Sequence, residues 1–339
     1  MLLSRRTLLA GAVAAPAILT GGRFGRAAPL RMKLSHQFPG GTIDEGDFRD
    51  RLSRRFAQEV EKRTNGALAF DIYPGSSLMK TNAQFSALRK GALDLCLLPL
   101  PYAGGEVAEL NIALMPALVT NYEQGLAWKK AEVGAELTRV LEDKGIKILT
   151  WVWQGGGVAS RGGPIVVPGD AKGLKIRGGS REMDLVLKAA GAAVVSMPSD
   201  EIYAAMQTGA IDAALTSSTS LISFRLQELA KGVTSARKLT YWFMLEPLLM
   251  SKSVFDGLPA EQRQVLTAVG AELETFGVKA ARADDDEVGR IFAAGGATIA
   301  DMDKGVVDQW RDIARDTAWK DYAARSPGCA KLLELAKAV

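Results

Sequence analysis

Two short stretches, ALRKGALD at residues 87–94 and AMQTGAID at residues 205–212, decide how this chain folds. In each, a helical segment ends on glycine and turns directly into an apolar strand that begins with aspartate. Two such units predict two similar α/β lobes, although a chance repeat of a common turn is the alternative. Since ligands of open α/β sheets bind at the carboxyl ends of strands, residues 98–102 and 216–220 are candidates for a cleft.

The sequence around these stretches alternates between strand-like and helical patterns. Residues 30–36 alternate as a strand does, and apolar positions recur at helical spacing over residues 43–64. Leu258-Pro259 predicts the start of a long helix that continues nearly to residue 292, because proline is favoured in the first turn. The alternation predicts parallel sheets covered by helices. The other expected strands are 67–73, 93–98, 146–153, 174–177, 193–196 and 211–216, and the other expected helices are 82–90, 122–143, 181–190, 199–208 and most of 303–337.

The composition is that of an ordinary globular protein. The chain has 339 residues, of which 47% are hydrophobic and 24% charged, enough for one large or two medium domains. The formal net charge of +4 comes entirely from residues 1–27, which hold four arginines and no acid; the rest has 42 − 4 = 38 basic and 38 acidic residues. With equal numbers of basic and acidic residues, the rest of the chain has no excess positive charge to attract a nucleic-acid partner or an anionic membrane.

Residues 1–27 have the pattern of an export signal. A basic pair, Arg5-Arg6, precedes an apolar run at residues 8–19, and small residues before Ala28 fit a cleavage site between Ala27 and Ala28. The pair resembles a twin-arginine motif, although general export signals can also carry two arginines. The alternative is an N-terminal helix. We expect a periplasmic protein that is soluble once the signal is removed.

Motifs for catalysis are missing from the sequence. His36 is the single histidine, which excludes a multi-histidine metal site and leaves little room for a Ser-His-Asp triad. No Gly-Lys dipeptide occurs, and the glycines at 155–157 have the wrong spacing for a dinucleotide fingerprint. We therefore expect no enzyme, no cofactor and no metal. Cys96 lies in an apolar run and resembles a buried core residue, and whether it pairs with Cys329 stays open.

The stretch GDAKGLKIR at residues 169–177 and the pattern at residues 191–212 are the most specific motifs. Together with YPGSSL at residues 73–78, they resemble the solute-binding subunits of tripartite ATP-independent periplasmic (TRAP) transporters, of the C4-dicarboxylate-binding type. The resemblance implies a two-lobed periplasmic binding fold of the class II type that closes on an organic acid and delivers it to membrane permease subunits. It also implies that Arg177 binds the ligand carboxylate, as a planar guanidinium can do with two parallel hydrogen bonds.

The sequence departs from the family pattern at two places. Thr216 stands where an asparagine is usual, and the arginine that some members carry about twenty residues before Arg177 is missing, so the stretch reads Trp153, Gln154 and three glycines. These departures argue against a dicarboxylate or a sialic-acid-like ligand. Further candidates for the cleft are aromatic or polar. The predicted ligand-binding residues are Arg177, Thr216, Gln154, Trp153, Tyr102, Phe38 and Trp242.

We expect lobe I to comprise 28–153 plus 242–281 and lobe II 154–241 plus 282–339, with the long helix spanning both. The expected function is capture of a carboxylate-containing organic acid by lobe closure in a monomeric protein. The alternatives are a ligand sensor for an organic acid, the same fold binding an aromatic or hydrophobic acid, and an enzyme on this fold, which the lone histidine disfavours.

Overall fold

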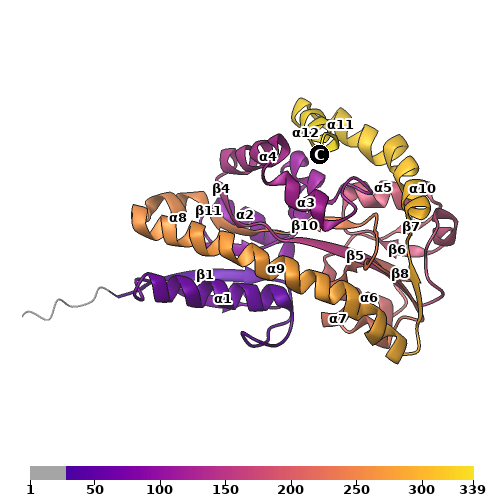
Figure 1. The fold of residues 1–339 in the computed structure, drawn as a ribbon, viewed down its shortest axis with the longest axis horizontal. Coiled ribbons are helices and arrows are strands. Elements are labelled where there is room, and N and C mark those ends of the chain that lie inside the picture. Colours follow the sequence, from indigo (N-terminus) through magenta and orange to yellow (C-terminus); the bar gives the residue numbers. More distant parts are fainter. Residues whose placement is uncertain (1–27) are drawn as a thin grey trace, which may run out of the picture.

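The structure is a computed structural model that describes residues 28–339. The predicted export signal and its cleavage site lie outside the described residues, apart from Ala28 itself. The chain forms two α/β lobes, each built around its own sheet (Figure 1). Within residues 28–339, no helix has the length and apolar character needed to cross a bilayer.

The first sheet has the strand order β2-β1-β3-β11-β4 and forms what we call the first lobe. β1 pairs in parallel with both β2 and β3, whereas β11 runs antiparallel to β3 and β4. The parallel strands therefore present their carboxyl ends at one edge, as expected for βαβ units. The strands are β1 (Leu30–His36), β2 (Leu68–Tyr73), β3 (Leu95–Leu97), β4 (Ile146–Thr150) and β11 (Leu248–Ser251).

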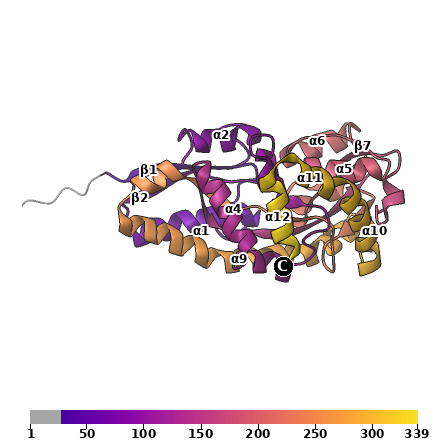
Figure 2. The same ribbon diagram turned by 90° about the horizontal axis from the view of Figure 1, so that it is seen from above.

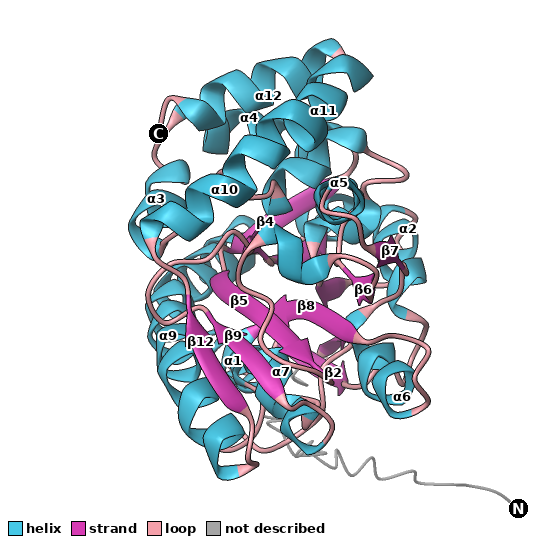
Figure 3. Cartoon of the chain, turned by 90° about the vertical axis from the view of Figure 1, so that its right-hand side faces the viewer, coloured by secondary structure: helices cyan, strands magenta, loops and turns pink. Residues whose placement is uncertain are grey.

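The second sheet has the order β12-β9-β5-β8-β6-β7, with β10 paired to β5, and forms the second lobe (Figure 3). The predicted strands at 174–177 and 211–216 are present as β6 and β8, which pair in parallel. The strands are β5 (Trp153–Ser160), β6 (Lys175–Arg177), β7 (Ala193–Val194), β8 (Ala213–Ser217), β9 (Gly232–Ser235), β10 (Phe243–Leu245) and β12 (Thr298–Asp301).

Most helices follow the predicted pattern with shifted ends, whereas α7 (Ser218–Ser223) and α8 (Lys252–Gly257) were not predicted. The helix expected from residue 43 begins at Phe48, because the Asp47 side chain accepts a hydrogen bond from the Arg49 backbone N–H and caps the helix there. The single helix expected over 122–143 is two helices, α3 and α4. The helices are α1 (Phe48–Arg63), α2 (Gln84–Arg89), α3 (Tyr122–Trp128), α4 (Glu132–Asp143), α5 (Arg181–Ala189), α6 (Ile202–Gln207), α7 (Ser218–Ser223), α8 (Lys252–Gly257), α9 (Ala260–Ala294), α10 (Lys304–Ala314), α11 (Lys320–Arg325) and α12 (Pro327–Lys337).

The long helix α9 spans the molecule, as predicted (Figures 1 and 2). It contacts α1 and β4 in the first lobe and α7, β9 and β12 in the second. The chain passes between the sheets after β4 at residues 151–152 and again between β10 and β11 at Glu246. The lobe boundaries stay a prediction, and α12 at the C-terminus contacts α4 of the first lobe.

One large buried apolar cluster extends from the first sheet into the second lobe, where it includes Ile176 of β6 and Leu215 of β8. A smaller cluster containing Val288 and Phe292 of α9 lies in the second lobe. Cys96 and Cys329 are both buried and free. His36 is also buried, where its Nε2 lies 3.1 Å from Asp50 Oδ1, so the lone histidine has a structural partner.

Candidate functional site

A narrow cavity lies between the two lobes, beyond the carboxyl ends of β3 and β8. About 10 Å³ of it is open to the centre of a water-sized sphere, which is room for about one water molecule. Pro99 and Tyr102 line one side and Thr216 and Ser217 the other, so the structure brings together the two ranges that follow the repeated stretches. Further lining comes from Gln37, Arg49, Arg177, Ser220, Trp242 and Glu246.

Arg177 is the last residue of β6, and its guanidinium is buried with only 2% of the residue exposed. Nε donates to the Met197 carbonyl at 3.1 Å, Nη1 to the Leu215 carbonyl at 2.7 Å, and Nη2 to the Tyr102 hydroxyl at 2.7 Å. A guanidinium has five N–H groups, so two remain without a protein acceptor. No carboxylate of residues 28–339 lies within 4.0 Å of this charge. A buried charge without a partner is costly, and an anionic ligand would supply the missing partner.

The backbone beside Arg177 leaves no room for a side chain. Gly179 has a φ of +97°, and a Cβ there would lie 2.8 Å from Arg177 Nη1. Glycine at this position therefore permits both the left-handed turn and the close approach to the guanidinium.

Tyr102 joins the two lobes at the cavity wall. Its hydroxyl oxygen accepts hydrogen bonds from Arg177 Nη2 and from the Ser199 backbone N–H at 3.0 Å. A phenol has one proton and two acceptor positions, so both acceptor positions are used and the O–H proton is left to donate. Tyr102 thus offers a hydrogen-bond donor beside the guanidinium.

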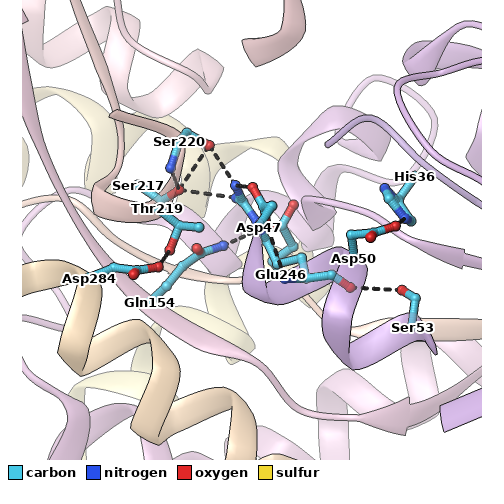
Figure 4. A network of polar contacts seen from close by, with 11 residues as sticks. His36, Asp47, Asp50, Ser53, Gln154, Ser217, Thr219, Ser220, Glu246 and Asp284 are labelled. Atoms are coloured by element: carbon cyan, nitrogen blue, oxygen red, sulfur yellow. Dashed lines mark hydrogen bonds and ion pairs between the residues drawn. The ribbon is translucent and has the colours of Figure 1, made fainter. Parts of the chain in front are cut away.

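Arg49, in the first turn of α1, is a second buried guanidinium with 1% of the residue exposed. Nε and Nη2 donate to the two oxygens of Asp47, at 2.9 and 2.7 Å. Nη1 donates to Ser217 and Glu246, and Nη2 also donates to Ser220. All five N–H groups are therefore used, and the serines place this network across both lobes. Figure 4 shows Ser217 and Ser220 facing Asp47 and Glu246.

Burial and the charge of Arg49 shift the pKa values of the neighbouring carboxylates in opposite directions. Burial alone would raise the pKa of Asp47, but the charge and hydrogen bonds of Arg49 outweigh it and hold that pKa below its usual range. Burial raises the pKa of Glu246 to about 7, despite the opposing charge of Arg49. Glu246 Oε2 also accepts a hydrogen bond from Gln154 Nε2, whereas Glu246 Oε1 has no partner.

Gln37 completes the lining, and the sequence analysis missed it. It follows β1 directly, is 1% exposed, and has no hydrogen-bond partner at either Nε2 or Oε1. A buried amide without partners is expensive, so this residue has the character of a ligand contact. The available signal was its place after β1, at the same sheet edge as Pro99.

Four of the seven predicted residues line the cavity: Arg177, Thr216, Tyr102 and Trp242. The other three lie behind the lining. The Phe38 ring stacks against the Arg49 guanidinium at 3.5 Å, and Gln154 donates to Glu246. Trp153 packs in the core, 5.2 Å from the Trp128 ring centroid. Trp153 does not line the cavity.

A further contact between the lobes lies near the cavity. The Asp200 carboxylate of the second lobe accepts hydrogen bonds from Ser76 Oγ at 2.8 Å and from Thr81 Oγ1 at 3.1 Å in the first lobe. Together with the bonds of Arg49 and Tyr102, these contacts connect the two lobes.

Two α/β lobes with a cavity between them, lined by a guanidinium that has no carboxylate partner, are the architecture expected of a solute-binding protein. The comparisons with known proteins agree. Residues 48–325 match the model of the bacterial extracellular solute-binding protein, family 7, and the chain belongs to this family.

The similarity to individual members extends over the whole chain. This chain is 63% identical over 337 residues to a solute-binding protein of Albidiferax ferrireducens, with 99% of each chain covered. A crystal structure of a TRAP periplasmic solute-binding protein from Rhodoferax ferrireducens with bound malonate is 66% identical, has a TM-score of 0.90, and covers 91% of this chain and 97% of its own. The C4-dicarboxylate-binding periplasmic protein DctP of Rhodobacter capsulatus is 28% identical over 274 residues, 80% of each chain.

Proposed function

We propose that this protein captures a small organic acid in the periplasm and delivers it to the membrane permease of a TRAP transporter. The ligand carboxylate binds Arg177 in the cavity, and closure of the lobes buries it. Membership of the family supports the transport role, and the pattern of residues 1–27 supports export with cleavage near Ala28. The protein acts as a monomer.

The observation that carries this proposal is the burial and incomplete hydrogen bonding of the Arg177 guanidinium. Its guanidinium is buried, it retains two N–H donors, and it lacks a carboxylate partner among the described residues. Two adjacent N–H groups match the two oxygens of a carboxylate. Tyr102 adds a third donor from the other lobe, so a bound carboxylate contacts both lobes at once.

The size of the cavity favours a small acid over a bulky aromatic one. The lobes leave room for about one water molecule between them, so they must separate to admit any organic acid, and a small acid requires the least separation. Malonate, which is bound in the relative from Rhodoferax ferrireducens, is a small acid of this kind. We therefore take malonate as the first ligand to test.

The experiment is calorimetric titration of the exported protein with malonate and with other short carboxylic acids. We expect Arg177→Ala to weaken binding by roughly 30-fold to several thousand-fold, because removing one partner of a buried charged pair costs about 2–5 kcal/mol. Arg181→Ala is the matched control, since Arg181 is half exposed and pairs with Asp321 outside the cavity. Equal affinities of wild type and Arg177→Ala would contradict the proposal.

A further inference from the structure

We propose that Gln37 and Glu246 form a second recognition point in the cavity, which selects short dicarboxylic acids by binding their second carboxyl group together with one proton. This inference rests on the proposed function, since it assumes that the first carboxylate binds Arg177. It adds a specificity-determining role for two residues and the uptake of one proton on binding.

The polar atoms without partners indicate where the second group binds. Gln37 Nε2, Gln37 Oε1 and Glu246 Oε1 are all buried, belong to residues that line the cavity, and lack any hydrogen bond in the structure. They include one donor group and two acceptors, or two donor groups and one acceptor once Glu246 is protonated. Leaving such atoms unmatched is unfavourable, and a polar group on the ligand would recover the lost hydrogen bonds.

Arg49 is not available for this role, although it lines the same cavity. Its five N–H groups are already bonded to Asp47, Ser217, Ser220 and Glu246. A second ligand carboxylate would have to displace one of these partners. The unused donors of this part of the site are therefore those of Gln37.

The charges around Glu246 require a proton when a second carboxylate arrives. Glu246 faces Arg49 from α1 and Gln154 from β5, Asp47 lies beside Arg49, and Arg177 lines the same cavity. The charge of Arg49 is already matched by Asp47. Two ionised carboxylates in contact repel one another in a dry site, and one of such a pair takes up a proton.

With Glu246 protonated, the hydrogen bonds can be completed. One oxygen of the ligand's second carboxylate accepts from Gln37 Nε2, and the other accepts the O–H of Glu246. Burial has already raised the pKa of Glu246 to about 7, so near neutral pH this proton costs little.

This inference reverses the expectation from the sequence that a dicarboxylate is disfavoured. That expectation considered only the second lobe, where Thr216 replaces the usual asparagine and an arginine is missing. In the structure, the second recognition point comes from Gln37 after β1 and from Glu246 at the crossing between the sheets.

The test measures malonate binding by calorimetry between about pH 7 and pH 9, where both malonate carboxyl groups are ionised. We expect wild-type affinity to fall with rising pH, approaching tenfold per pH unit above the pKa of Glu246, because binding takes up a proton. Titrations in two buffers with different ionisation enthalpies give the number of protons, which we expect to approach one at the upper end of the range.

Glu246→Gln keeps the shape and mimics the protonated acid. We expect it to bind malonate at the highest pH at least as tightly as wild type, with no proton uptake and with affinity that changes less than about twofold across the range. Glu182→Gln is the matched control. Burial also raises the pKa of Glu182 to about 7, but Glu182 does not line the cavity, so its variant should keep the wild-type pH dependence.

The outcomes separate this inference from the proposed function. Malonate binding to wild type without proton uptake or pH dependence would refute the role of Glu246, while capture of an acid by Arg177 would stand. Tight binding of monocarboxylates such as acetate, with malonate bound no better, would refute selection for dicarboxylic acids. If no short carboxylic acid bound, the proposed function itself would fail. Should Glu246→Gln not fold, proton uptake by the wild type still decides.

Discussion

Arg49 and Arg177 place two guanidinium groups in the lining of one cavity, equally buried but differently bonded. Arg49 donates all five N–H groups to protein side chains, including the two oxygens of Asp47. Arg177 donates three, all to uncharged oxygens, and has no carboxylate partner among the described residues. Arg49 therefore stabilises the fold, whereas Arg177 keeps two N–H donors that a ligand can use.

Substitution of the two arginines should affect the ligand-free protein unequally. Arg49→Met leaves Asp47 and Glu246 without their cation, and breaking a buried ion pair costs about 3–5 kcal/mol, so we expect a loss of that size in the free energy of unfolding. Arg177→Met removes an unmatched charge along with three hydrogen bonds, so its loss should be smaller. Urea denaturation of both variants without ligand measures the difference. A larger loss for Arg177→Met would contradict this assignment.

Tyr102→Phe should weaken ligand binding without unfolding the protein. The change removes the acceptor for Arg177 and Ser199 and the donor beside the guanidinium. At about 0.5–1.5 kcal/mol for each hydrogen bond, we expect affinity for malonate to fall roughly tenfold. Tyr203→Phe is the control, because the Tyr203 hydroxyl bonds Glu228 at the surface of the second lobe. If both variants bound malonate like wild type, the predicted donor role of Tyr102 would be wrong.

Asp200→Ala should speed the release of bound ligand more than it slows capture. Its carboxylate accepts two hydrogen bonds from Ser76 and Thr81 of the other lobe, and we expect both bonds to break when the lobes separate. Losing them destabilises the closed form, and we expect a dissociation rate roughly tenfold faster. Stopped-flow fluorescence can follow the change, since Trp242 lines the cavity. Glu201→Ala, one residue further on, should leave the rate unchanged.

The free energy of unfolding without ligand should fall as pH rises from about 4.5 to about 7. Burial raises the pKa of Glu182 to about 7 and that of Asp285 to about 6, so the folded protein binds more protons than the unfolded chain in this window. Glu182→Gln cannot ionise and should remove roughly 2–3 kcal/mol of this fall. Urea denaturation at several pH values measures it. A variant whose stability changes with pH exactly as the wild type's does would show that Glu182 does not contribute.

The residues of the second lobe could be predicted because local sequence places them. Arg177 and Thr216 lie at the ends of β6 and β8, and strand ends at the carboxyl edge of a sheet face the cleft. Tyr102 follows β3 in the same way. The position after the repeated stretches pointed to Thr216 and Tyr102, whereas the family resemblance pointed to Arg177, and the contacts of all three were not predictable.

The contribution of α1 and of the second crossing could not be predicted from spacing. Arg49 bonds Ser217 and Glu246, which are 168 and 197 residues away along the chain. No local sequence pattern predicts such pairs, because an arginine near the start of a helix is common on protein surfaces and gives no sign of a distant partner. Phe38 was expected at the cavity as an aromatic residue, but its ring supports the Arg49 guanidinium and the neighbouring Gln37 lines the cavity instead.

The β5 strand was missed, apart from its first residue Trp153, for a different reason. Its three glycines weaken a strand pattern, because glycine lacks a side chain that packs on a sheet. The structure explains them by close contacts: a Cβ on Gly156 would lie 2.2 Å from the Trp242 ring, and one on Gly157 would lie 1.9 Å from the Thr234 carbonyl oxygen. Such requirements depend on neighbours that are distant in the sequence.

The length of α9 has a mechanical consequence. Its 35 residues form a rod of roughly 50 Å that is attached to both lobes. Near one end, Gly270 lies so close to β4 that a Cβ would be 2.2 Å from the Leu149 carbonyl oxygen, and Phe292 near the other end is fully buried in the second lobe. Any rotation that opens the cavity must therefore flex this rod or break its attachment at one end. The bending stiffness of α9 therefore contributes to the work needed to separate the lobes and empty the site.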